Sequence, residues 1–141
     1  MSSYLTIYAK VKGVEKPSPM ISWSRNNKVY QSLVDHIAYI GNGDKMQFTE
    51  LTVDLINIGI EDLKTDIKDF EKYLVEYEKH AGTNDEYIPR IVELKEEIED
   101  CNSAISILLF VRDLVEELKY GYPDDDNTDL IKMESYLANI D

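Results

Sequence analysis

The sequence has few of the residues that make covalent links and metal sites. Its single cysteine, Cys101, excludes an intramolecular disulfide and is typical of a reducing compartment. Its only two histidines, His36 and His80, are distant in the chain from each other and from Cys101, so the spacing of a zinc site or of a Cys/His nucleophile is missing. We therefore expect no metal and no other cofactor.

Long hydrophobic runs and secretory features are also missing. The longest apolar stretch, residues 105–111, is interrupted by Ser106 and is far shorter than the roughly 20 residues of a membrane-spanning helix. The first residues, MSSYLTIYAK, lack the charged region, the apolar region and the cleavage site of a secretory signal. We expect a cytoplasmic protein that does not bind membranes.

Positive charge is scarce. Against 28 Asp and Glu the chain has 15 Lys and Arg, a formal net charge of −13, which argues against nucleic-acid binding because that binding needs cations to neutralise phosphates. Six of the cations but only three of the anions lie in residues 1–45. This asymmetry favours association with a basic partner or with further copies of the chain.

The first 50 residues predict a small base of mixed α and β structure. Apolar and polar residues alternate over 4–11, and 20–24 is a short second strand that can pair back with the first. Residues 29–40 have apolar side chains at helical spacing and predict a helix of about three turns that ends at Gly41. Residues 46–51 suit either a third edge strand, which we favour, or the start of the next helix.

Residues 51–121 predict a long antiparallel helical hairpin of the coiled-coil type. Apolar residues alternate at spacings of four and three from Ile56 to Tyr77, and again from Ile91 to Val115. The short link between the two runs requires antiparallel neighbours. Residues 122–141 predict an acidic turn and a short C-terminal helix. The fold class is therefore α+β, mostly α, in one compact domain.

Carboxylates near the loop end of this hairpin are the candidate partner-binding site. A rigid rod with spaced carboxylates can occupy a groove that evolved to bind phosphates, although acidic helix faces most often serve only solubility. The candidates are Asp62, Asp66, Asp69, Glu76, Glu93, Glu96, Glu97 and Asp100.

Two further groups of residues are candidate sites. The first lies at the junction between the second strand and the helix, where free N–H groups favour an anion, or where the same side chains simply cap the helix: Trp23, Arg25, Asn26, Asn27 and Lys28. The second is an apolar surplus near the open end of the hairpin, at Leu109, Phe110 and Leu114, which two helices alone cannot bury. It predicts a homo-oligomer, with a dimer favoured.

Motifs for catalysis are missing. The segment Gly41-Asn42-Gly43 is not followed by the residues of a phosphate-binding loop, and the acidic turn at 124–128 departs from a calcium loop at Asp129 and Ser135. We therefore expect a protein without enzymatic activity.

The segments SSYLTIY and ISWSRNNKVYQSL, followed by an acidic helical hairpin, resemble the small acidic proteins that bacteriophages and other mobile elements encode. The resemblance assigns no role to a single residue. It implies assembly or anti-defence work inside the host cell through binding. The leading hypothesis is a phage-type inhibitor of a basic or nucleic-acid-binding host protein. The alternatives are an assembly protein that forms homo-oligomers, and a binder of a small anionic, nucleotide-like ligand at the junction.

Overall fold

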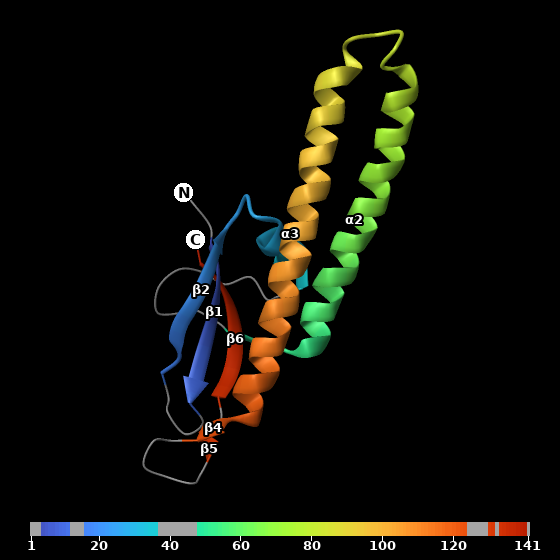
Figure 1. Ribbon diagram of the computed structural model, residues 1–141. Coiled ribbons are helices and arrows are strands. Elements are labelled where there is room, and N and C mark those ends of the chain that lie inside the picture. Colours follow the sequence, from blue (N-terminus) through green and yellow to red (C-terminus); the bar gives the residue numbers. More distant parts are fainter. Residues whose placement is uncertain (1–3, 12–15, 37–47, 124–129, 132, 141) are drawn as a thin grey trace.

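The fold is α+β and mostly helical (Figure 1). The computed structural model describes residues 4–11, 16–36, 48–123, 130–131 and 133–140. In chain order the elements are β1 (Tyr4–Val11), β2 (Ser18–Ser24), α1 (Lys28–Leu33), the 3-10 helix η1 (Val34–His36), β3 (Thr49–Glu50), α2 (Val53–His80), α3 (Tyr87–Tyr120), β4 (Tyr122–Pro123), β5 (Leu130–Ile131) and β6 (Met133–Ile140).

Four antiparallel strands form the main sheet in the order β2-β1-β6-β3. The predicted hairpin of β1 and β2 is confirmed, with Ile7 opposite Ile21. Five consecutive residues of β1, from Leu5 to Ala9, are buried. The alternation in β1 predicts one solvated face, but side chains on both faces of the strand are buried. β2 and β6 pair with its two edges.

The predicted C-terminal helix is wrong. Residues 133–140 form β6, which pairs with β1 along its whole length, from Met133 opposite Val11 to Ile140 opposite Tyr4. The apolar residues Met133, Leu137 and Ile140 are spaced by four and three, which fits a helix better than the alternation of a strand. Pairing with β1 decides between the two, because β1 would otherwise keep a row of unpaired backbone groups next to the core.

The elements after β2 begin largely where the sequence predicts. Asn27 caps α1 by accepting a hydrogen bond from the backbone N–H of Val29, at 2.9 Å. The helix predicted over 29–40 is seen as α1 and η1 up to His36, and its remainder, with Gly41, lies outside the described residues. Within 46–51 the favoured strand is present as β3, and Thr52 then caps α2 at the N–H of Leu55.

The antiparallel helical hairpin is confirmed, with α2 of 28 and α3 of 34 residues. Its lower part packs against the sheet and α1, and its upper part extends beyond them (Figure 1). We call residues 64–100 the arm. All of them are described, and none is fully buried. The arm is held by half-buried apolar residues between its two helices, among them Ile67, Phe70 and Leu94.

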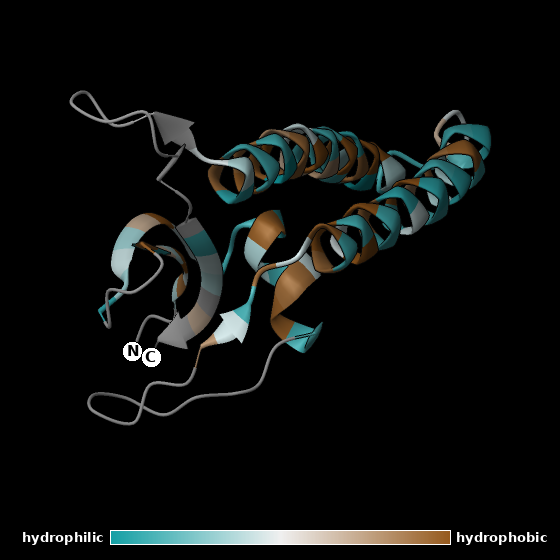
Figure 2. Cartoon of the chain, turned by 90° about the horizontal axis from the view of Figure 1, so that it is seen from below, coloured by the Kyte–Doolittle hydropathy of each residue, from teal (hydrophilic) through white to brown (hydrophobic). Residues whose placement is uncertain are grey.

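One apolar core joins the sheet, α1 and the base of the hairpin. Figure 2 shows α1 between the sheet and the two long helices. At the crossing, Gly59 of α2 lets α1 approach, since a Cβ atom there would lie only 2.8 Å from Cδ2 of Leu33. The core consists of Leu5, Ile7, Trp23, Val29, Tyr30, Leu33, Leu51, Ile56, Ile60, Leu63, Cys101, Ala104, Leu108, Val111 and Val115.

Candidate protein-binding face of the arm

The structure brings six of the eight candidate carboxylates to one side of the hairpin, the side on which α1 docks. They line three hollows there. Asp62 and Asp66 line the first hollow together with residues of α1. Asp100 lines the second together with Asn27, the cap of α1. Glu93, Glu96 and Glu97 line the third, which lies further up the arm. The six are Asp62, Asp66, Glu93, Glu96, Glu97 and Asp100. We call this side the α1-side face.

Helical spacing explains why these residues share a side. Residues three, four and seven apart lie above one another on a helix, as Glu93, Glu96 and Asp100 do on α3. The other two candidates, Asp69 and Glu76, do not line these three hollows, although their spacing continues the row of Asp66 on α2. Asp69 follows Asp66 by three residues, and Glu76, which accepts a 3.3 Å hydrogen bond from His80, lies seven residues further.

Above α1, the α1-side face contains a groove with an aromatic floor. Its hollow of about 310 Å³ is lined by Phe70, Tyr73 and Tyr77 of α2 and by Arg90, Glu93, Leu94, Glu96 and Glu97 of α3. We call it the aromatic groove. Tyr73 is 56% exposed, although it lies in the middle of the arm. Such exposure of a large ring is the feature that a merely solvated helix face does not need.

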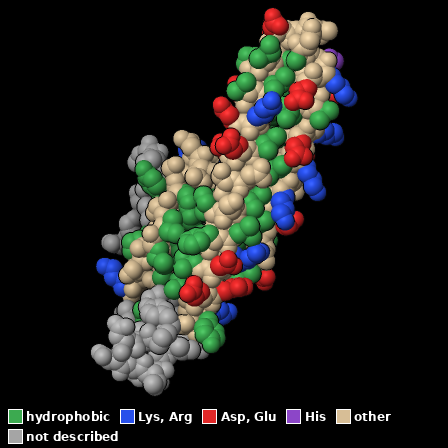
Figure 3. Space-filling view, viewed as in Figure 1, with side chains coloured by type: hydrophobic (Ala, Val, Ile, Leu, Met, Phe, Trp, Pro, Cys, Tyr) green, Lys and Arg blue, Asp and Glu red, His purple; other side chains and the backbone are tan. Residues whose placement is uncertain are grey.

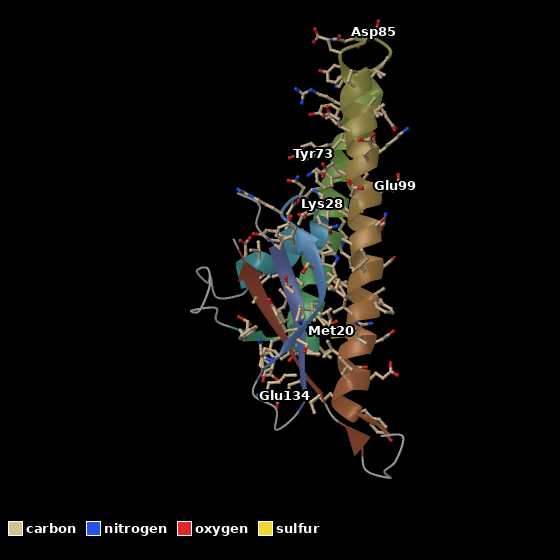
Figure 4. All side chains as sticks on the ribbon, turned by 90° about the vertical axis from the view of Figure 1, so that its left-hand side faces the viewer. Met20, Lys28, Tyr73, Asp85, Glu99 and Glu134 are labelled. Atoms are coloured by element: carbon tan, nitrogen blue, oxygen red, sulfur yellow. The ribbon has the colours of Figure 1, made fainter. Side chains whose placement is uncertain are left out.

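Lys28, the first residue of α1, ties the base of the molecule to this groove. Its Nζ forms an ion pair with Glu97 and lies 5.7 Å from the centre of the Phe70 ring. Burial lowers the pKa of Lys28, but the hydrogen bond to Glu97 and the charges of Glu97 and nearby groups outweigh it, so the pKa is raised overall. Figure 4 shows Lys28 and Tyr73 on one side of the hairpin and Glu99 on the other.

The candidate anion site is used largely for folding. Trp23 is buried in the core, and the side chain of Asn27 caps α1. The backbone carbonyls of Arg25 and Asn26 each accept a hydrogen bond from the side chain of Gln31, at 3.4 Å. Lys28, one of the two cations of this junction, is paired with Glu97 of α3.

The apolar patch predicted for self-association is exposed only in part. Phe110 is 62% and Leu109 38% exposed, whereas Leu114 is half-buried. Phe110 and Leu114, four residues apart, lie on the same side of α3, and Leu109 is turned by about 100° from Phe110. Figure 3 shows hydrophobic side chains gathered between the sheet and the lower half of α3.

The rest of the described chain offers little chemistry of other kinds. No three of its His, Cys, Asp and Glu side chains are placed to hold a metal ion. Cys101 is wholly buried, and this burial raises the pKa of its thiol. None of the described helices combines the length and the apolar character needed to cross a membrane.

Tyr73 and Arg90 lie outside every site that the sequence predicts, and the heptad spacing places Phe70 and Tyr77 only in the helical seam. The signal was present in the spacing of three and four that puts aromatic residues at 70, 73 and 77.

Comparison with known proteins adds no relative, because no protein-family model, curated protein or solved structure matches this chain. The geometry of the α1-side face is therefore the basis on which a function can be proposed.

Proposed function

We propose that this chain is a non-enzymatic protein-binding module that presents the α1-side face of its arm to a basic partner. A host protein that binds nucleic acid fits this chemistry best, because its surface is built to receive a row of negative charges. A phage-type inhibitor would act in this way, by occupying that surface.

One observation carries the proposal: six carboxylates and an open groove with aromatic lining share one side of the hairpin, and five of the six lie on its projecting arm. Carboxylates alone would support solubility equally well. Carboxylates beside the exposed ring of Tyr73 provide both the charge and the apolar contact that protein interfaces combine. The heptad spacing of the hairpin predicts coiled-coil packing, which would keep this face rigid and lower the entropic cost of binding.

The test removes two charges from the α1-side face and compares the effect with removing two elsewhere. The variant is Glu93→Gln/Glu96→Gln, and the matched control is Glu71→Gln/Glu99→Gln, which changes exposed residues outside the groove. Glu97 is left in place because it pairs with Lys28, so changing it would also disturb the docking of α1 on the arm.

The measurement is affinity capture from an extract of the cell that makes the protein, at low and at physiological salt. Proteins that native protein and control retain, and that the Glu93→Gln/Glu96→Gln variant loses, support the proposal. Their capture should weaken as salt rises, because charges are screened over about 8 to 10 Å near physiological ionic strength. Equal losses in the two variants would show that only net charge matters, and the proposal would fall.

A second candidate function is assembly with further copies of the chain. It is favoured by the exposure of Phe110, a large apolar side chain of α3 that is 62% exposed. The two functions use different parts of α3 and are compatible in one molecule.

A further inference from the structure

The lower end of the aromatic groove already contains a cation from the chain itself. The Lys28 ammonium lies over the Phe70 ring and pairs with Glu97, and only 19% of the Lys28 side chain is exposed. Here a ring and a carboxylate flank the charge of a cationic side chain that α1 brings to the groove.

The same combination of rings and carboxylates recurs about one turn further up the arm, where Arg90 of α3 also lines the hollow but takes part in none of the ion pairs of the described residues. Tyr73 and Tyr77 continue the aromatic row above Phe70, and Glu93 and Glu96 of α3 line the same hollow. Among the ion pairs of the described residues, none involves Glu93 or Glu96.

We propose that this upper position binds an arginine side chain of the basic partner, with its guanidinium stacked on Tyr73 and paired with Glu93 or Glu96. This inference rests on the proposed function and deepens it by naming what the groove recognises. A hollow of about 310 Å³ admits a long side chain but no folded element.

Arginine fits the position better than lysine for two reasons. Its planar guanidinium stacks on an exposed ring, whereas an ammonium is a compact and strongly hydrated charge. Its five donors, held in one plane, can also serve two carboxylates on successive turns of a helix. The lysine at the lower position does not argue against this preference, because Lys28 is the first residue of α1 and is placed there by the packing of that helix.

The test compares fluorescein-labelled nona-arginine with nona-lysine, which have the same charge, by fluorescence anisotropy. We expect native protein to bind nona-arginine about threefold more tightly, a ratio in the range of one exposed cation–π contact. Because both peptides respond equally to net charge, the ratio of their affinities reports what the guanidinium adds over the ammonium, and the Tyr73 variants measure the share of the ring.

Three variants make the result specific. Tyr73→Leu keeps the apolar surface and removes the ring, so the two peptides should bind about equally. Tyr73→Phe keeps the ring and should keep the preference. In Glu71→Gln/Glu99→Gln both peptides should weaken by the same factor, and the ratio should stay as in native protein. Since Tyr73 is 56% exposed, its substitution leaves the core intact, which circular dichroism checks.

Two outcomes would overturn this inference. One is equal binding of the two peptides to native protein, and the other is an unchanged preference in Tyr73→Leu. Either result can occur while the Glu93→Gln/Glu96→Gln variant loses its captured proteins and its matched control keeps them. The proposed function then stands, and only the inferred binding of an arginine side chain is contradicted. If that variant and its matched control lose binding equally, the proposed function itself falls.

Discussion

At the scale of single residues, Lys28 connects the two halves of the molecule. It begins α1, which belongs to the base, and its charge is held by Glu97, which belongs to the arm. One carboxylate of the acidic arm thus holds the base through an ion pair. Glu97 is therefore engaged in an ion pair, whereas Glu93 and Glu96 are in none of the ion pairs of the described residues, although all three line the aromatic groove.

Replacing this lysine should change how stability depends on pH. Because the pKa of Lys28 is raised in the folded state, its contribution is complete below the ordinary value of 10.5 and is lost as pH rises through the folded value. We expect Lys28→Met to lower stability by about 1 kcal/mol or less near pH 8, since the pair is partly exposed, and this difference to disappear at a pH above the folded pKa of Lys28, which is higher than 10.5.

Urea unfolding of both proteins at these two pH values measures the effect. The pKa values of Tyr8 and Tyr136 are also raised, so both proteins lose some stability in alkali, and only the difference between them reports on Lys28. A difference that stays constant between the two pH values would contradict the prediction.

At the scale of elements, the contact between α1 and α2 depends on a glycine. A Cβ at position 59 would lie 2.8 Å from Cδ2 of Leu33, 3.4 Å from Cδ1 of Leu108 and 3.5 Å from Oγ of Ser32. Leu33 and Leu108 are fully buried. The glycine therefore has a packing role in the middle of a helix, where it would otherwise cost stability.

Gly59→Ala should destabilise the protein. On an open helix the change would raise the free energy of unfolding by about 1 kcal/mol. Here Leu33 must move within a packed core, so we expect the free energy of unfolding to fall by about 1 kcal/mol. Gly82→Ala in the loop between α2 and α3 is the control, because nothing lies within 4 Å of a Cβ added there. Thermal unfolding of both variants compares them, and a stabilised Gly59→Ala would show that α1 packs less tightly than described.

At the scale of the whole molecule, the arm and the base offer different surfaces. The arm carries carboxylates and the exposed ring of Tyr73, whereas the lower half of α3 presents the exposed ring of Phe110. Burial of Phe110 between two copies would leave both arms free, provided that the interface stays below the α1-side face.

Self-association through this patch is testable in solution. We expect a dimer at tens of micromolar by light scattering, and a monomer for Phe110→Ser, because the exposed ring is the largest apolar group that an interface could remove from water there. Val92→Ser, which removes a 51% exposed apolar side chain from the arm part of the same helix, should remain a dimer. Native protein that is a monomer at this concentration would rule out the patch.

Much of this molecule follows from local sequence. The hairpin is visible in spacings of three and four residues, and the starts of α1 and α2 are marked by Asn27 and Thr52, whose side chains cap the helices. These features depend on groups within a few residues of one another, so the sequence alone determines them. The net charge and its concentration after residue 45 are likewise properties of the sequence.

Only the tertiary structure decided that residues 133–140 complete the sheet, because their partner β1 lies at the opposite end of the chain. It also decided that the candidate carboxylates surround an aromatic groove on the side where α1 docks. Spacing puts Glu93 and Glu96 on one side of α3, but which side of the hairpin that is depends on how α2 and α1 pack against it. Local periodicity records the faces of each helix, and packing between distant elements determines which of those faces meet.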